Sequence, residues 1–177
     1  MGDKTACDSS SAIDRTPFIW ETATMRFEDW KKALIGQWQG TTRLYLEPPP
    51  AAGVVSESRL TVAPIAGGTF LQLNYDWSHE GEAQSGVLIV GYEDADAASA
   101  AWVDSFHMSA KIMFCTGSVA EGAATLTGSY AAPPGPDWGW RIALKLVSAD
   151  ELQIVMHNIW PEGKEDLAVQ ADYKRRR

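Results

Sequence analysis

The sequence predicts an all-β protein: a single closed antiparallel meander β-barrel of roughly ten strands with a short N-terminal helix. Three observations predict this fold. From Gly36 onward, apolar and polar residues alternate with a period of two, and turn-rich clusters separate the runs at short spacing. No helix-length pattern interrupts the runs, which argues against parallel βαβ units. Closing so many consecutive strands into a barrel also removes the exposed edges of an open sheet.

The helix is predicted within residues 26–35, where Phe27, Trp30 and Leu34 recur at near-helical spacing before Gly36. Residues 1–24 are polar and lack an apolar core, so we expect a flexible N-terminal arm and no secretory signal. The barrel domain is expected to span residues 25–174. Residues 175–177 are expected to form a solvated basic tail.

Composition limits the partners. The chain has 177 residues, enough for one domain, and 45% of them are hydrophobic, but no apolar stretch is long enough to span a bilayer. The net charge of −8 disfavours binding to nucleic acid. We therefore expect a cytoplasmic protein without nucleic-acid or membrane partners. Cys7 and Cys115 are expected to be reduced thiols.

Period-two alternation assigns each strand residue to the inside or the outside of the barrel. The clearest strand places Trp138 and Trp140 inside and Arg141 outside, and a later strand places Leu167 and Val169 inside. Six of the eight tryptophans are assigned to the lumen. The predicted lumenal aromatic residues are Trp38, Tyr75, Trp77, Trp102, Phe106, Trp138, Trp140, Trp160 and Tyr173, and the predicted lumenal polar residues are Asp104 and Asn158.

Apolar walls with a few polar groups are typical of a small-molecule pocket. A barrel of ten strands is wider than the eight-stranded kind that side chains nearly fill. We therefore predict a cavity for a small apolar or aromatic ligand. In the alternative, the rings simply fill the barrel, and Asp104 and Asn158 satisfy indole and tyrosine hydrogen bonds.

Asp104 is the candidate catalytic residue. A carboxylate among indole rings loses hydration, so we expect its pKa to rise, which suits proton transfer. The alternative is a structural ion pair, with Arg141 as the partner. His107 is the other candidate, but residues three apart on a strand face opposite sides. The two side chains can meet only if the strand ends or bulges between them.

The sequence contains no pattern typical of a metal or cofactor site. Its three histidines, His79, His107 and His157, have no cysteine or carboxylate at ligand spacing. His157 is assigned to the outer face, which argues against a haem ligand. No phosphate-binding loop or nucleophile elbow is present. We therefore expect neither a metal nor a cofactor.

Several short motifs together resemble a known family. Residues 34–40 (LIGQWQG) resemble the Gly-x-Trp opening of calycin barrels, the superfamily of lipocalins and fatty-acid-binding proteins. With Gly91-Tyr92 and residues 101–107, 131–141 and 156–159, the chain resembles a bacterial domain family of unknown function grouped with the calycin-like barrels, over about residues 26–174. This resemblance implies a lipocalin-like fold and carries no activity. Haem-binding relatives use a histidine ligand, and none maps securely here.

Three functional classes follow. The first is an intracellular lipocalin-like barrel that binds a small apolar or aromatic molecule in a Trp-rich lumen. The second is a small cofactor-free enzyme, an isomerase, cyclase or hydrolase, that uses Asp104 with His107 or Arg141 for proton transfer. The third is a structural barrel with a filled interior. The outward apolar residues Val155 and Ile159 suggest either a homodimer surface or a surface packed under the helix.

Overall fold

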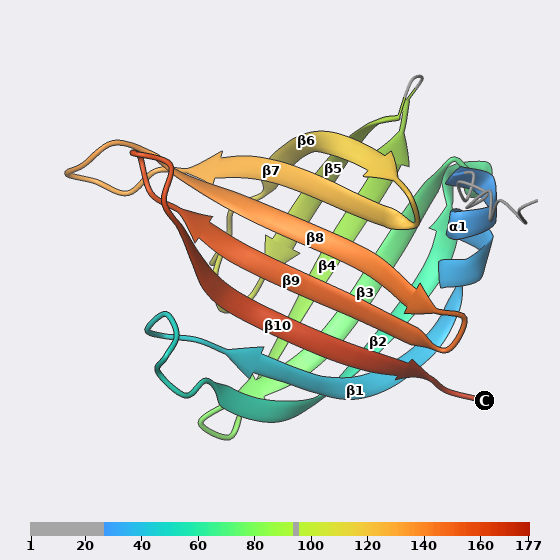
Figure 1. The fold of residues 1–177 in the computed structure, drawn as a ribbon, viewed down its shortest axis with the longest axis horizontal. Helices are drawn as coiled ribbons and strands as arrows, with labels where there is room; N and C mark the ends of the chain where they lie inside the picture. Colours follow the sequence, from blue (N-terminus) through green and yellow to red (C-terminus); the bar gives the residue numbers. More distant parts are fainter. Residues whose placement is uncertain (1–26, 94–95) are drawn as a thin grey trace, which may run out of the picture.

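The computed structural model describes residues 27–93 and 96–177 and confirms a ten-stranded closed antiparallel barrel (Figure 1). The predicted arm, residues 1–24, and Cys7 lie outside the described residues. Each strand pairs with its neighbours in the chain, and β1 closes the barrel against β10. The strands are β1 Gly36–Leu44, β2 Val54–Ile65, β3 Phe70–His79, β4 Glu82–Tyr92, β5 Ala97–Asp104, β6 Met113–Ala120, β7 Ala123–Tyr130, β8 Trp138–Ser148, β9 Glu151–Ile159 and β10 Glu165–Arg175.

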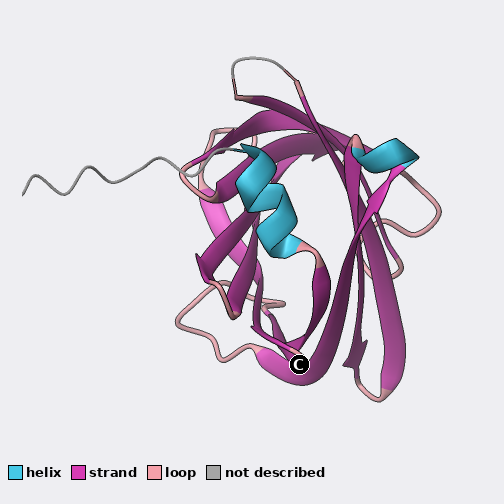
Figure 2. Cartoon of the chain, turned by 90° about the vertical axis from the view of Figure 1, so that its right-hand side faces the viewer, coloured by secondary structure: helices cyan, strands magenta, loops and turns pink. Residues whose placement is uncertain are grey.

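The helix α1, Phe27–Leu34, covers one end of the barrel (Figure 2). Glu28 and Asp29 in its first turn interact favourably with the helix dipole. Trp30 and Leu34 are fully buried, and the Trp30 indole nitrogen donates a hydrogen bond of 2.7 Å to the carbonyl of Gly122. We call this the closed end.

The opposite end is formed by the turns at residues 45–53, 80–81, 105–112, 131–137 and 160–164, which join β1–β2, β3–β4, β5–β6, β7–β8 and β9–β10. No described helix covers these turns, and we call this the open end. Strand β5 finishes here at Asp104, and β8 begins here at Trp138. The site described below lies at this end.

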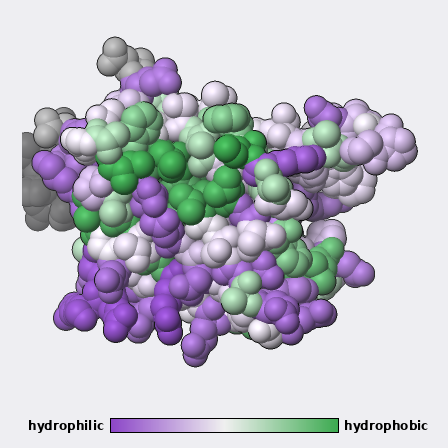
Figure 3. All heavy atoms as spheres, turned by 180° about the vertical axis from the view of Figure 1, so that it is seen from behind, coloured by the Kyte–Doolittle hydropathy of each residue, from purple (hydrophilic) through white to green (hydrophobic). Residues whose placement is uncertain are grey.

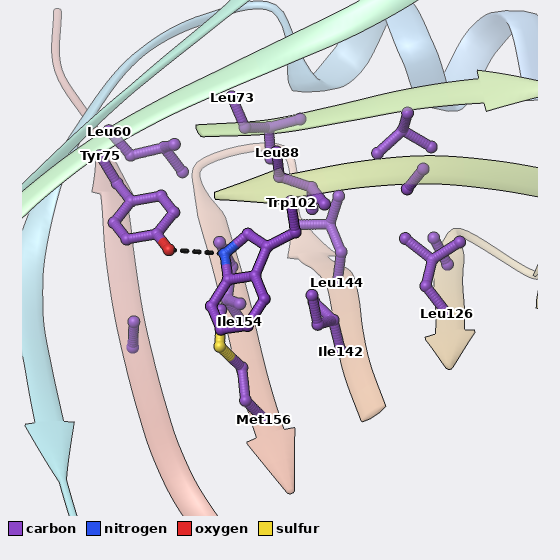
Figure 4. Packing of buried hydrophobic residues seen from close by; sticks show 14 of the residues in the cluster. Leu60, Leu73, Tyr75, Leu88, Trp102, Leu126, Ile142, Leu144, Ile154 and Met156 are labelled. Atoms are coloured by element: carbon purple, nitrogen blue, oxygen red, sulfur yellow. Dashed lines mark hydrogen bonds between the residues drawn. The ribbon is translucent and has the colours of Figure 1, made fainter. Parts of the chain in front are cut away.

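Side chains fill most of the interior (Figure 4). Trp38 and Trp102 are among the largest fully buried side chains. Around Trp102 lie aliphatic residues from both walls of the barrel: Leu60, Leu73, Leu88, Leu126, Ile142, Leu144, Ile154 and Met156. These side chains belong to one buried hydrophobic cluster, so much of the barrel interior is core rather than pocket.

Strand β10 departs from the simple alternation in its first half. A β-bulge shifts the register between Leu167, which pairs with His157, and Val169, which pairs with Met156. The prediction that Leu167 and Val169 share the inner face was therefore wrong, because the extra residue, Ala168, reverses the phase.

The C-terminal boundary also differs from the prediction. Arg175 is not part of a solvated tail; it is the last residue of β10. Its guanidinium lies 4.0 Å from the ring centroid of Trp38 and donates hydrogen bonds to the carbonyls of Ala33, Ile35 and Ala149. These contacts join β10 to the end of α1.

The outer face of the barrel combines charged residues with an apolar area (Figure 3). Phe114 on β6 is 75% exposed, and Ile112 beside it is 57% exposed. Val155 and Ile159 are half-buried. In the part of the chain that the structure describes, no helix is long and apolar enough to span a membrane.

Candidate functional site

Asp104 ends strand β5 and organises the turn that follows. Its Oδ1 accepts hydrogen bonds from the backbone N–H groups of Phe106, at 2.9 Å, and His107, at 2.8 Å. The backbone N–H of Met108 bonds to the Asp104 carbonyl at 3.0 Å. An aspartate commonly starts a turn in this way, because its short side chain satisfies the N–H groups of the next residues. Strand β5 therefore ends between Asp104 and His107, which is the condition under which their two side chains can meet.

The turn brings His107 back onto Asp104. The Nδ1 atom of His107 lies 3.0 Å from Oδ1 of Asp104, although the two side chains would face opposite sides of a continued strand. The His107 side chain is 15% exposed. Among the described residues, its Nε2 has no hydrogen-bond partner.

The second oxygen of Asp104 belongs to a buried chain of hydrogen bonds. The indole nitrogen of Trp102 donates to the hydroxyl of Tyr75 at 2.8 Å (Figure 4), and that hydroxyl donates to Oδ2 of Asp104 at 2.8 Å. Gly86 makes room for the Tyr75 ring, because a Cβ atom there would lie 2.2 Å from it. The carboxylate thus receives donors on both oxygens.

These contacts reverse the expected protonation behaviour of Asp104. Desolvation by burial raises its pKa, but the hydrogen bonds and charge of His107 and the hydroxyl of Tyr75 outweigh it, so the pKa is lowered. The predicted rise in the pKa of Asp104 was wrong. Burial, together with the Asp104 charge, raises the pKa of Tyr75 well above its ordinary value, so Tyr75 remains a neutral donor.

Aromatic rings surround the imidazole of His107. Ring centroids lie 5.0 Å away for Phe106, 5.2 Å for Trp140, 5.9 Å for Trp102 and 6.2 Å for Trp77. These four rings come from β3, β5, β8 and the β5–β6 turn. We call them, with His107, the aromatic cluster.

Trp140 has an unsatisfied polar atom. Its side chain is 3% exposed and stacks on Trp102 at 5.4 Å, but its indole N–H has no partner in the structure. Tyr130 lies edge-on to it at 6.5 Å and donates its hydroxyl to Oδ1 of Asn158 at 2.7 Å. Buried donors without partners are rare in native proteins and require an explanation.

A narrow, half-open pocket lies beside the cluster. It is lined by Thr42, Tyr75, Trp77, Asp104, His107, Ile154, Met156, Val169, Ala171 and Tyr173. The room available to the centre of a water molecule is about 20 Å³, whereas pockets for drug-sized ligands have volumes of about 300–1,000 Å³. In the described part of the chain, this pocket is much smaller than the cavity that the sequence predicted, because tryptophan and aliphatic side chains fill much of the interior. Tyr173 is already paired with Ser58 at 2.8 Å.

The other predicted site residues lie elsewhere. Trp138 and Trp160 are half-buried at the open end, with ring centroids 4.4 Å apart. Trp38 lies at the closed end, where its indole nitrogen donates to the carbonyl of Leu34. The alternative in which Arg141 pairs with Asp104 is not realised, because Arg141 lies on the outer face, as its position in the strand predicted.

On that face the guanidinium of Arg141 pairs with Glu165. Among the described residues, no group of three histidine, cysteine, aspartate or glutamate side chains could hold a metal ion. Tyr130 is the site neighbour that the sequence analysis missed, and the alternation of Leu126, Gly128 and Tyr130 along β7 could have identified it.

The arrangement can supply two kinds of polar contact among apolar side chains. His107 lines the half-open pocket and has one nitrogen bonded to a carboxylate, and Trp140, whose ring lies 5.2 Å from the imidazole, carries an N–H. Within residues 27–93 and 96–177, neither His107 Nε2 nor this N–H has a hydrogen-bond partner. A neutral imidazole held in this way can accept a hydrogen bond or a proton.

Comparison with solved structures supports the fold. The structure of the S-type phycobiliprotein lyase CPES from Guillardia theta is similar, with a TM-score of 0.58 and 14% identity over 86% of this chain and 94% of that chain. The crystal structure of Rv2717c from M. tuberculosis is similar with a TM-score of 0.54 and 15% identity, over 82% of this chain and 94% of that one. A search of curated proteins finds no match. The family model described as "Protein of unknown function (DUF1579)" matches residues 27–175, so the chain belongs to this family.

Proposed function

We propose that this protein is an intracellular, lipocalin-like barrel that binds a small apolar or aromatic molecule at its open end, within the aromatic cluster. One observation carries the proposal: among the described residues, His107 Nε2 and the Trp140 N–H have no partners, and both lie among aromatic rings near the open end. Polar atoms that the fold does not use, placed in an apolar surround, are typical of ligand sites. One protein of similar fold is a phycobiliprotein lyase, which is compatible with a small-molecule ligand.

The small pocket volume implies that the ligand displaces side chains. Phe106 and His107 belong to a turn, residues 105–110, between β5 and β6 at the open end of the barrel. Phe106 is half-buried and contacts Trp77 and His79 edge-on, at 5.4 and 5.1 Å. Displacement of the Phe106 ring would enlarge the pocket while Asp104 keeps its contact with His107, because a side chain in a turn moves at lower cost than paired strands.

Binding can be tested with the neutral fluorescent probe N-phenylnaphthylamine. We expect saturable, one-to-one fluorescence enhancement with the wild-type protein. Trp140→Phe should weaken binding about threefold to tenfold, because it removes part of the ring surface that covers the ligand. Trp30→Phe is the matched control: the same substitution at the closed end should leave the affinity unchanged. Equal effects of the two variants, or no saturable enhancement, would contradict the proposal.

The contact between Asp104 and His107 favours a second candidate, a cofactor-free enzyme in which His107 is the base. In this version Asp104 orients the imidazole and does not itself transfer the proton, since its pKa is lowered. Native mass spectrometry of protein purified from its own host tests this candidate. A retained molecule that the wild type converts, and that His107→Phe binds but does not convert, would establish the enzyme. A retained molecule that is not converted supports the binding protein.

A further inference from the structure

We propose that the ligand is a hydroxylated aromatic molecule, whose hydroxyl donates a hydrogen bond to His107 Nε2 and whose oxygen accepts one from the Trp140 N–H. This inference deepens the proposed function and depends on it. It is carried by two unpartnered atoms: His107 Nε2, which can accept a hydrogen bond, and the Trp140 N–H, which can donate one.

The role of His107 Nε2 follows from its neighbour. An ionised carboxylate can only accept hydrogen bonds, so the Nδ1 atom 3.0 Å from Asp104 Oδ1 must carry the proton. In the neutral imidazole, Nε2 then has a lone pair and no proton. In this neutral form the site accepts at Nε2, and the matching ligand group is an O–H or N–H donor.

The role of the Trp140 nitrogen is fixed by its chemistry, since an indole N–H only donates. It is buried and unpaired, while the rings of Trp140 and His107 lie 5.2 Å apart. Trp140 does not itself line the pocket, so the inference requires that the displaced Phe106 side chain lets a ligand acceptor reach this N–H. A hydroxyl group supplies one donor and two acceptor lone pairs, so one functional group satisfies both requirements.

The aromatic rings around His107 indicate that the ligand is itself aromatic. Trp102 and Trp140 stack with an interplanar angle of 12°, and Trp77 and Phe106 lie edge-to-face at 68°. Flat rings gain additional stabilisation in such surroundings through stacked and edge-on contacts. The other polar atoms of the neighbouring pocket are largely used: the hydroxyls of Tyr75 and Tyr173 both have partners. The negative charge of ionised Asp104, beside His107, repels an anionic ligand, so a neutral ligand is favoured.

The test compares beta-naphthol with its methyl ether, which has the same rings and oxygen but no donor. Affinities are measured by displacement of N-phenylnaphthylamine. For the wild type, we expect the naphthol to bind about tenfold more tightly, the effect of one hydrogen bond of about 1.4 kcal/mol. His107→Phe retains the ring but loses Nε2, so the preference should fall to about one while the ether binds as before.

The matched control is His157→Phe, the same substitution on the outer face of β9. It should preserve the tenfold preference. Trp140→Phe should weaken both compounds, since both contain the acceptor oxygen. Thermal unfolding of each variant checks that the barrel is intact.

The outcomes separate the two proposals. If the naphthol and the ether bind the wild type equally well, the hydroxyl inference is overturned, but the binding function stands. If the preference persists in His107→Phe, Nε2 is not the acceptor, and the inference is also overturned. If neither compound displaces the probe and the probe itself does not bind, the proposed function fails, and this inference fails with it.

Discussion

At the scale of single residues, Asp104 is the group on which the site depends. Its Oδ1 holds the turn and the imidazole, and its Oδ2 accepts the hydroxyl of Tyr75. A buried carboxylate with donors on both oxygens stabilises the fold and is a poor proton acceptor. The role of Asp104 is thus to position His107, which is the residue that meets the pocket.

Asp104→Asn should lower the free energy of unfolding by about 1–3 kcal/mol at neutral pH, because buried donors lose a charged acceptor. The pKa of Asp104 in the folded protein is lowered from 3.8, so its stabilisation is present above that pH and is lost as the pH falls through the folded pKa. Urea denaturation across this range should therefore show the difference between wild type and variant shrinking below about pH 4. A difference that stays constant with pH would contradict this account.

At the scale of elements, the two ends of the barrel differ: the helix α1 covers the closed end, whereas the β5–β6 turn lies at the open end. The helix buries Trp30 and Leu34 and is tied to the β6–β7 turn by a hydrogen bond to Gly122. In the turn at the other end, Phe106 and His107 are half-buried and partly exposed to solvent. The helix therefore acts as a fixed lid, whereas at the open end the side chain of Phe106 is the group that a ligand can displace.

Trp30→Phe tests the fixed lid. The variant keeps an aromatic ring but leaves the Gly122 carbonyl without its indole donor, so we expect a loss of about 1–2 kcal/mol in the free energy of unfolding. Chemical denaturation measures this loss. Hydrogen exchange at the β5–β6 turn should not change, because the two ends share no contact through this bond; faster exchange there would show that the ends are coupled.

At the scale of the whole molecule, stability depends on closure of the barrel between β1 and β10. Gly40 lies on this seam opposite Tyr173. A Cβ atom at Gly40 would lie 1.9 Å from the backbone oxygen of Asp172. No flexible side chain can move aside here, so the close approach of the two strands requires glycine.

Gly40→Ala should therefore destabilise the protein by about 3 kcal/mol or more, since the strands must separate to admit the methyl group. Gly135→Ala is the control, because its nearest contact would be at 3.5 Å in an exposed turn, and its effect should stay within about 0.5 kcal/mol. Thermal and urea unfolding of both variants measure the difference. Equal stabilities would show that the seam tolerates separation.

The homodimer suggested by the sequence stays a prediction, which sedimentation velocity can test.

Sequence patterns predicted much of this structure because strand alternation and helix periodicity are local properties. The ten strands, the helix at Phe27–Leu34 and the inward position of Trp140 follow from spacing, whereas the inward position of Trp102 was predicted from the bulk of its aromatic ring. The bulge that reverses Leu167 does not, because one inserted residue leaves no mark in composition.

The sequence by itself determined the barrel, its meander order and the residue types on its inner wall. Tertiary structure decided how much of that wall encloses space, which oxygens of Asp104 have donors, and that Arg141 pairs with Glu165. It also decided that His107 meets Asp104. The physical reason is that alternation fixes only the direction of a side chain, whereas cavity volume, pKa and unpaired polar atoms depend on neighbours brought together from distant strands.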